Sequence, residues 1–392
     1  MSSILRVLVD ARMLVCRFSG VARVVTSLIE ELCRREDIRI TALCGREPYA
    51  PWEDRSGIET MTTNFDRNHL DPLRRFLWER RNISRIIRDS MVDLFHATWN
   101  TGVPANCPVP TVLTVHDLIG WRRRDHGWRG PLNRSILRHA LTSAMRNATR
   151  VTTVSEFVRR DLLATIRVDP RKVSTVYNAA GPPSAAAENR SGSDPPFALY
   201  VGGHESRKNV HGILATLDRF WNRGFDAMIL KLTGSLSSLS PAAFRTFHTM
   251  KWRQRVHFIG QPTDAELSRL YRTAELLVCL SHDEGFGLPV LEAMAHGCPV
   301  VVSNRAALPE VVGGAGVVVD PDDLDAAAVA VEQIRSDSNF RSKLVLKGRE
   351  RAAGFGWSHS ADQFHRIYSE SAGCRNLKSA RNLMPLPDPI PA

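Results

Sequence analysis

The sequence lacks any apolar run of the ~20 residues that a membrane-spanning helix needs. Its first apolar segment, residues 4–10, is interrupted by Arg6 and closed by Asp10, which is more typical of a buried strand than of a secretory signal. We therefore expect the chain to act in the cytoplasm. At 392 residues, with 43% hydrophobic and 24% charged residues, the composition is that of a globular protein too long for one core, which predicts two domains.

Metal-binding patterns are also missing. The seven cysteines are scattered and form no C-x-x-C pair, so we expect reduced, buried thiols and neither a zinc site nor a disulfide framework. Asp320-Pro321-Asp322 has the D-x-D spacing of some metal-dependent sugar transferases. It follows an apolar strand over residues 317–319, however, and capping of a helix with Pro321 in its first position explains it fully. The sequence predicts no metal and no cofactor.

Lysine is absent before Lys172, although the net charge is +11. The basic residues are therefore nearly all arginines, a bias that the composition of the coding DNA alone could produce. The charge favours an anionic partner and leaves nucleic acid, anionic lipid and phosphorylated substrates open.

Strand and helix patterns alternate along the chain, which predicts parallel sheets covered by helices. The alternation stops in a stretch rich in proline, serine and alanine and then restarts, so each half forms its own doubly wound domain. Ligands bind at the carboxyl ends of the strands in such sheets, and we expect a cleft between the two domains. The predicted segments are an N-terminal domain (1–180), a linker (181–196), a C-terminal domain (197–356), a helix that could cross back to the N-terminal domain (357–373) and a disordered tail (374–392).

Two glutamates, Glu284 and Glu292, flank a Gly-Phe-Gly-Leu-Pro turn between a strand over residues 276–280 and a helix that we expect to begin at Pro289. The glycines allow close approach of a ligand, and the amides of Gly287 and Leu288 would face an anion at the helix start. A carboxylate can hold two neighbouring hydroxyls of a ribose. An acidic residue in a first helical turn needs no ligand, but that alternative explains neither Glu284 nor the doubled glycine.

A second strand end carries Gly202-Gly203 and then Arg207-Lys208 just before a helix. The helix dipole disfavours cations there unless an anion lies between, which indicates a diphosphate; the alternative is two solvated charges.

The first half has weaker signals. Gly20 stands alone after the first strand, without the G-x-G-x-x-G of a nicotinamide-cofactor site. His116 ends the apolar strand over residues 111–116 and faces the expected cleft, where it is either structural or functional.

The run E284-G-F-G-L-P-V-L-E292-A resembles the E-x7-E motif of retaining GT-B glycosyltransferases of family 4. The resemblance spans roughly residues 4–372, and the form H204-E-S-R-K-N209 is similar to the bacterial mannosyl- and rhamnosyltransferase branch. It implies a GT-B fold of two Rossmann-like domains. One departure is Gly203, where many members have an arginine that Arg207 could replace.

The resemblance also implies roles for site residues. Glu292 would hold the nucleotide ribose and Glu284 the donor sugar, while His116 would touch the transferred sugar. The implied catalytic residues are His116 and Glu284, and the implied donor-binding residues are Gly20, Arg207, Lys208, Gly285, Phe286, Gly287, Leu288 and Glu292. No residue is a convincing enzymic nucleophile, so the family's front-face mechanism is implied, with positive groups stabilising the leaving diphosphate.

The expected reaction is transfer of α-mannose from GDP-mannose to a polyprenyl-diphosphate-linked oligosaccharide of exopolysaccharide or lipopolysaccharide. Tryptophans interleaved with arginines, over residues 76–81 and 121–129, suit an anionic membrane surface, here the inner face of the cell membrane, or equally a solvated basic face. Open alternatives are UDP-glucose, UDP-GlcNAc or dTDP-rhamnose as donor, and a GT-B epimerase or phosphorylase. A basic nucleic-acid-binding protein is disfavoured because the strongest motifs are glycine turns and paired acids.

Overall fold

The computed structural model describes residues 4–16, 19–46, 57–122, 131–181, 195–225 and 227–373. The chain divides into two compact units. The first comprises the residues up to Ala179 together with the segment from Trp357, and the second runs from Ala180 to Gly356. In the described ranges, no helix has both the length and the apolarity to cross a membrane.

The first unit is built on a seven-stranded sheet in which all strand pairs are parallel. Its strand order is β3-β2-β1-β4-β5-β6-β7, so the order reverses between β1 and β4. The strands are β1 (Leu5–Asp10), β2 (Ile38–Cys44), β3 (Ile58–Thr62), β4 (Leu94–Ala97), β5 (Thr111–Val115), β6 (Arg150–Thr153) and β7 (Val173–Thr175).

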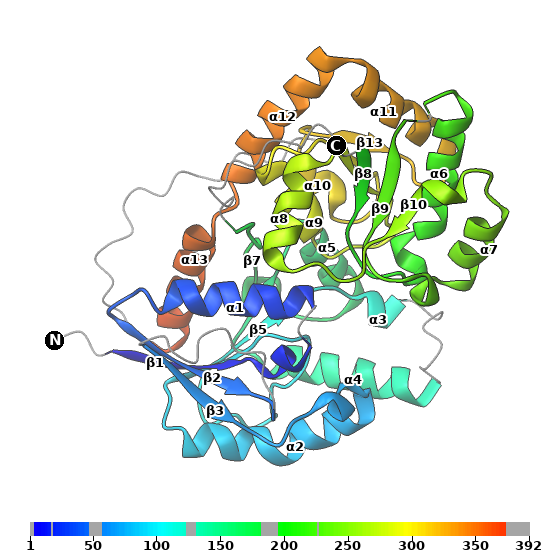
Figure 1. Cartoon of the computed structure of the whole chain (residues 1–392). Coiled ribbons are helices and arrows are strands. Elements are labelled where there is room, and N and C mark those ends of the chain that lie inside the picture. The colour runs from blue at the N-terminus through cyan, green and yellow to red at the C-terminus, as the bar shows by residue number, and fades with distance from the viewer. Residues whose placement is uncertain are drawn as a thin grey trace. The chain divides into compact units, whose positions relative to one another are not determined.

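Helices cover both faces of this sheet, with α1 and α13 on one face and α2 and α4 on the other (Figure 1). Phe364 and Tyr368 of α13 are buried in the same core as the central strands, so this late segment completes the first unit. The helices are α1 (Gly20–Leu32), α2 (Pro72–Asp89), α3 (Ile119–Arg122), α4 (Pro131–Asn147), α5 (Glu156–Thr165) and α13 (Trp357–Ser371).

The second unit repeats the plan with a six-stranded, fully parallel sheet of order β10-β9-β8-β11-β12-β13. Here the order reverses between β8 and β11, where Leu276 pairs with Ala198. The strands are β8 (Phe197–Tyr200), β9 (Ile229–Leu232), β10 (Val256–Phe258), β11 (Leu276–Cys279), β12 (Val300–Ser303) and β13 (Val317–Val319).

In this unit α6 packs with α7 and α11, and α9 packs with α8, α10 and α12 (Figure 1). The buried strand residues and the inner faces of α6 and α11 form one continuous core. The helices are α6 (Val210–Asn222), α7 (Pro241–Thr249), α8 (Asp264–Thr273), α9 (Leu288–Ala295), α10 (Leu308–Val312), α11 (Leu324–Ser336) and α12 (Ser338–Ala353).

The predicted α/β class with two doubly wound parallel sheets is confirmed. Two helix starts were predicted wrongly. Helix α9 begins at Leu288 with Gly287 as its N-cap, so Pro289 is the second helical residue. Helix α11 begins at Leu324 with Asp323 as its N-cap, and Asp320 instead accepts a hydrogen bond from the Asp322 amide in the turn before it.

No disulfide joins the cysteines within the described part of the chain. Cys44, Cys279 and Cys298 are buried, as expected, but Cys16, Cys33 and Cys107 are only half-buried. The predicted tail lies outside the described residues.

Candidate active site

The reversal of strand order in the second sheet brings two loops together. In open doubly wound sheets, ligands bind at the carboxyl ends of the strands that flank such a reversal. The loop after β8 carries a 3₁₀ turn, Ser206–Lys208, and the loop after β11 leads to α9. The amide of His282 donates to the Arg207 carbonyl over 2.8 Å, so the two loops are joined through their backbones.

The side chains at this junction form a compact ion cluster. Lys208 Nζ lies 2.7 Å from Glu284 Oε1, and Arg207 Nη1 lies 3.4 Å from Glu284 Oε2 and 3.1 Å from the Asp283 carbonyl oxygen. The exposed fractions of the three ionic side chains are 14% for Lys208, 18% for Arg207 and 11% for Glu284. The structure thus brings together three of the residues that the sequence analysis assigned to the donor.

This cluster explains why two cations are tolerated just before a helix. The sequence suggested that an anion must lie near them, and in the structure the adjacent anion is the carboxylate of Glu284. Burial by itself would raise the pKa of Glu284, but the charges of Lys208 and Arg207 hold that pKa below its ordinary value. Glu284 is therefore ionised at neutral pH.

The glycine turn next to the cluster positions the start of α9. Gly287 has φ of 107°, a left-handed conformation that favours glycine, and a Cβ built there would lie 2.6 Å from Leu308 Cδ2. The amides of Val290 and Leu291 both bond back to the Gly287 carbonyl. The positive end of the α9 dipole therefore lies directly after Gly285 and Phe286.

Phe286 has a structural side chain. It is buried, and its ring packs edge-on against Phe355 with the ring centroids 5.9 Å apart. Only its backbone is suited to a donor contact.

Glu292 lies in α9 and is 8% exposed. Its Oε2 accepts a hydrogen bond of 2.9 Å from the hydroxyl of Tyr271 in α8. Tyr271 was not predicted from the sequence, because a tyrosine on the apolar face of a helix is typical of an ordinary core residue. This hydrogen bond fixes the position of one oxygen of the Glu292 carboxylate.

Gly203 stands where many members of the family that the sequence resembles have an arginine, and its neighbour in this structure is Glu205. A Cβ built on Gly203 would lie 2.5 Å from Glu205 Oε2, so the Glu205 carboxylate occupies the space that a side chain at position 203 would enter. The cations of this loop are Arg207 and Lys208, which both point to Glu284.

Gly20 and His116 belong to the first unit. Gly20 is the first residue of α1 and follows the N-cap Ser19. His116 directly follows β5; its Nε2 lies 2.8 Å from the Thr98 carbonyl oxygen, and its amide donates to Asn100 Oδ1 over 2.9 Å. Because a carbonyl only accepts, Nε2 carries the proton. Burial lowers the pKa of His116 despite the opposing effect of Thr98 and Asp117, so the ring is neutral at pH 7, with Nδ1 as an acceptor.

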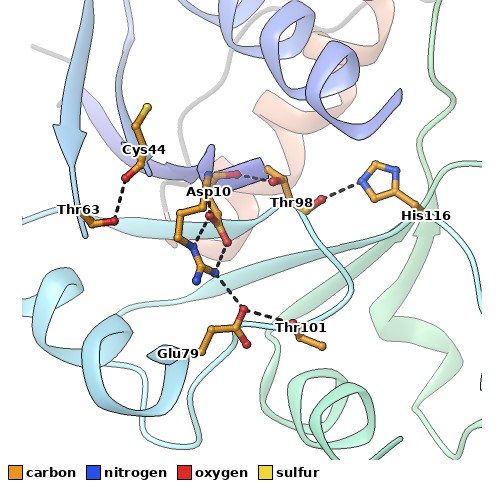
Figure 2. Close-up of polar contacts among 8 residues, drawn as sticks. Asp10, Cys44, Thr63, Glu79, Thr98, Thr101 and His116 are labelled. Carbon is orange, nitrogen blue, oxygen red and sulfur yellow. Dashed lines mark hydrogen bonds and ion pairs between the residues drawn. The ribbon is translucent and has the colours of Figure 1, made fainter. Parts of the chain in front are cut away.

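A buried network lies behind His116 at the strand-order reversal of the first sheet (Figure 2). Arg12 donates to both carboxylate oxygens of Asp10, over 2.8 and 2.6 Å, and to Glu79 Oε1 over 3.1 Å. The Thr98 hydroxyl donates to the Asp10 carbonyl, which ties the His116 support to this network. Arg12 and Glu79 were not predicted from the sequence, because 67 residues separate them.

The predicted basic surface is only partly described. Residues 123–129 of the predicted tryptophan–arginine segment lie outside the described residues. In α2, Leu73 and Leu77 are each 38% exposed. The same outer face of α2 carries the exposed arginines Arg74, Arg80, Arg81, Arg85 and Arg88.

No group of three or more metal-ligating side chains that could hold an ion occurs within the described ranges. In the D-x-D turn, Asp320 and Asp322 both pair with Arg305, at 3.1 and 3.6 Å.

The two halves of the chain each match a known family. Residues 18–182 match Glycosyltransferase Family 4, and residues 183–351 match Glycosyl transferases group 1. The chain is 30% identical to a glycogen synthase of Mycobacterium tuberculosis over 70% of its own length and 68% of that protein.

Other relatives match over shorter regions. O-antigen chain mannosyltransferase B of Escherichia coli is 35% identical over 44% of this chain and 45% of its own length. An O-antigen chain mannosyltransferase of Salmonella typhimurium is 28% identical over 57% of this chain and 60% of its own. The chain thus spans about half the length of these two mannosyltransferases.

Solved structures share the fold. Sucrose-phosphate synthase of Thermosynechococcus elongatus has a TM-score of 0.75 at 19% identity and covers 94% of this chain and 100% of its own. The Anabaena protein HepE, in complex with UDP and glucose, has a TM-score of 0.70 at 17% identity, with 93% and 100% coverage. With both halves matched in order and the fold shared, this chain belongs to the family 4 glycosyltransferases of the GT-B fold.

Proposed function

We propose that this protein is a retaining glycosyltransferase that moves an α-mannosyl group from GDP-mannose to a polyprenyl-diphosphate-linked oligosaccharide, in the synthesis of lipopolysaccharide or exopolysaccharide. The observation that carries the proposal is the cluster of Arg207, Lys208 and Glu284 beside the start of α9, where a sugar diphosphate needs both cations and a hydroxyl acceptor. The two O-antigen mannosyltransferases among the relatives support mannose as the sugar.

In the proposed donor complex, Arg207, Lys208 and the amides at the start of α9 hold the diphosphate. Glu292, oriented by Tyr271, accepts from the ribose hydroxyls, and Glu284 accepts from a hydroxyl of the sugar. For His116, in the first unit, the proposed role is contact with the transferred sugar; Nδ1 is the ring atom that can accept a hydroxyl, because Nε2 donates to the Thr98 carbonyl.

The transfer step needs charge stabilisation more than a covalent nucleophile. The bond from the anomeric carbon to the phosphate oxygen breaks, and the acceptor oxygen bonds to the same face of that carbon. The acceptor proton passes to the leaving phosphate oxygen. Arg207, Lys208 and the α9 dipole stabilise the negative charge that develops on the diphosphate.

The donor is tested by thermal-shift and transfer assays with GDP-, UDP- and dTDP-sugars. GDP-mannose should raise the melting temperature most and should give an α-linked product by proton NMR. Stabilisation by UDP-sugars alone would refute mannose transfer from GDP-mannose; UDP-glucose is the second candidate because HepE is solved with UDP and glucose. Turnover of the donor without an acceptor, or only with free phosphate, would instead indicate an epimerase or a phosphorylase.

The lipid-linked acceptor implies contact with the inner face of an anionic membrane, and the outer face of α2 has suitable chemistry. Exposed arginines attract anionic headgroups, while Leu73 and Leu77 can enter the interface. Arg80→Glu with Arg81→Glu should abolish cosedimentation with phosphatidylglycerol vesicles and slow transfer to a lipid acceptor. Arg160→Glu with Arg167→Glu, on exposed positions of the same unit, is the matched control. If both double variants bound vesicles equally, or if the protein shifted RNA and not vesicles at physiological salt, this part of the proposal would fail.

A further inference from the structure

The ion cluster at the junction of the β8 and β11 loops has an unusual property for an anion-binding site. The two cations that would hold a diphosphate are already paired with an anion of the protein itself, Glu284. Lys208 and Glu284 are in close contact at 2.7 Å, and all three side chains are largely withdrawn from solvent. The cluster therefore carries one net positive charge and not two.

We propose that Glu284 acts as an internal counter-anion, which competes with the diphosphate for Lys208 and Arg207 and so promotes release of the nucleoside diphosphate product. This role rests on the proposed function, since it takes the diphosphate of the donor as the ligand of the two cations. It is additional to the contact of Glu284 with the donor sugar.

The physical basis is the low screening of charges at this depth. Charges within a few ångströms in a partly buried site interact several-fold more strongly than in water. Burial by itself would raise the pKa of Glu284. The pKa is lowered instead, because the charges of Lys208 and Arg207 attract the ionised carboxylate. An incoming diphosphate must therefore displace the Glu284 carboxylate from the two cations or share the cations with it.

The competition has a consequence for the reaction cycle. While the donor sugar is bound, its hydroxyl donates a hydrogen bond to Glu284, so Lys208 and Arg207 can pair with the diphosphate. After transfer that hydroxyl is gone, and the carboxylate returns to Lys208 and Arg207. Binding is thus weakened for the product more than for the donor, which favours release of the product.

The test measures binding of inorganic pyrophosphate, which has neither base nor sugar, by calorimetry. Glu284→Gln keeps the shape of the side chain and removes the charge. We expect this variant to bind pyrophosphate and nucleoside diphosphates about tenfold more tightly than the parent, with a steeper loss of affinity as salt rises. Its turnover should fall and become limited by product release.

Glu275→Gln is the matched control. Glu275 directly precedes β11 at its amino end, whereas Glu284 follows its carboxyl end, and the buried Glu275 carboxylate pairs with the half-buried Arg341. The control should lower the melting temperature without changing pyrophosphate affinity. Unchanged or weaker pyrophosphate binding by a folded Glu284→Gln protein would overturn the proposal.

A double-mutant cycle with Lys208→Met separates competition from general disorder of the site. If Glu284 competes for Lys208, its removal should tighten pyrophosphate binding much less in the Lys208→Met background; an equal effect in both backgrounds would refute the pairing.

Failure of the counter-anion role and failure of the proposed function are distinguishable. If the parent protein transfers sugar but Glu284→Gln does not change pyrophosphate binding, only the counter-anion role is refuted. If the parent protein binds pyrophosphate but no nucleotide sugar, the proposed function is refuted.

Discussion

At the scale of single residues, the contact between Tyr271 and Glu292 sets the geometry of the proposed ribose site. Tyr271→Phe removes the hydroxyl that donates to Glu292 Oε2 and leaves the ring in place. We expect affinity for the nucleotide to fall about tenfold or more, because a hydrogen bond to a charged group contributes about 1.5 kcal/mol or more and about 1.4 kcal/mol corresponds to a factor of ten. Titration calorimetry with the nucleoside diphosphate measures this change.

Tyr368→Phe is the matched control for that variant. It also deletes a buried tyrosine hydroxyl, which bonds to His96 Nδ1 over 2.6 Å, but it lies in the first unit. It should lower stability without weakening nucleotide binding. Equal nucleotide affinity of Tyr271→Phe and the parent protein would contradict the proposed role of Glu292.

The residues predicted from sequence and those missed differ in one physical respect. Arg207 and Lys208 stand out because two cations just before a helix conflict with the helix dipole, and Glu284 stands out because it flanks a doubled glycine. Tyr271 and Arg12 agree with their local patterns, and their roles arise only through partners far along the chain. Sequence reasoning finds local conflicts and misses long-range pairs whose members are each locally unremarkable. The roles assigned to the predicted residues stay predictions until the variants are measured.

At the scale of elements, Gly287 decides where α9 begins and what its amides face. Gly287→Ala places a Cβ 2.6 Å from Leu308 Cδ2 at a φ of 107°, so either α10 or the turn must move. We expect the free energy of unfolding to fall by about 1–3 kcal/mol and pyrophosphate binding to weaken. Chemical denaturation and calorimetry test the two effects together.

Gly348→Ala provides the contrast, because Gly348 lies inside α12 and a Cβ there would meet Met294 at an ordinary 3.5 Å. This control should be neutral or stabilising by up to about 1 kcal/mol, with pyrophosphate binding unchanged. A Gly287→Ala protein as stable as the parent would show that the left-handed turn is not needed.

The elements themselves were largely predictable, and the misses have physical causes. A strand that is buried on both faces reads as an apolar run, as β11 does, and this strand was predicted. β3 lies at the sheet edge with no fully buried residue, so its sequence carries no strand pattern. The start of α9 was misplaced because Pro289 is tolerated at either of the first two helical positions. Gly287 is the N-cap, so the helix begins at Leu288.

At the scale of the whole molecule, the first unit depends on a helix from the far end of the chain. The Tyr368 hydroxyl bonds to His96 of β4, 272 positions away, and the other ring nitrogen of His96 lies 2.7 Å from Thr114 Oγ1. Burial, with a smaller contribution from His116, lowers the pKa of His96 from 6.5 to about 3. The core that receives α13 therefore contains an imidazole that must stay neutral.

This burial makes the stability of the first unit dependent on pH. Between about pH 6.5 and pH 3 the unfolded chain protonates His96 and the folded chain does not, so acidification favours unfolding. The stabilisation is complete above pH 6.5 and is lost as the pH falls, with a slope of at most about 1.4 kcal/mol per pH unit from this one group. His96→Gln retains a polar contact toward Thr114 and cannot titrate, so it should be less stable than the parent at pH 7.5 yet lose less stability on going to pH 5.5. Scanning calorimetry at several pH values tests this, and parallel losses in the two proteins would show that the acid sensitivity of the unit comes from other groups.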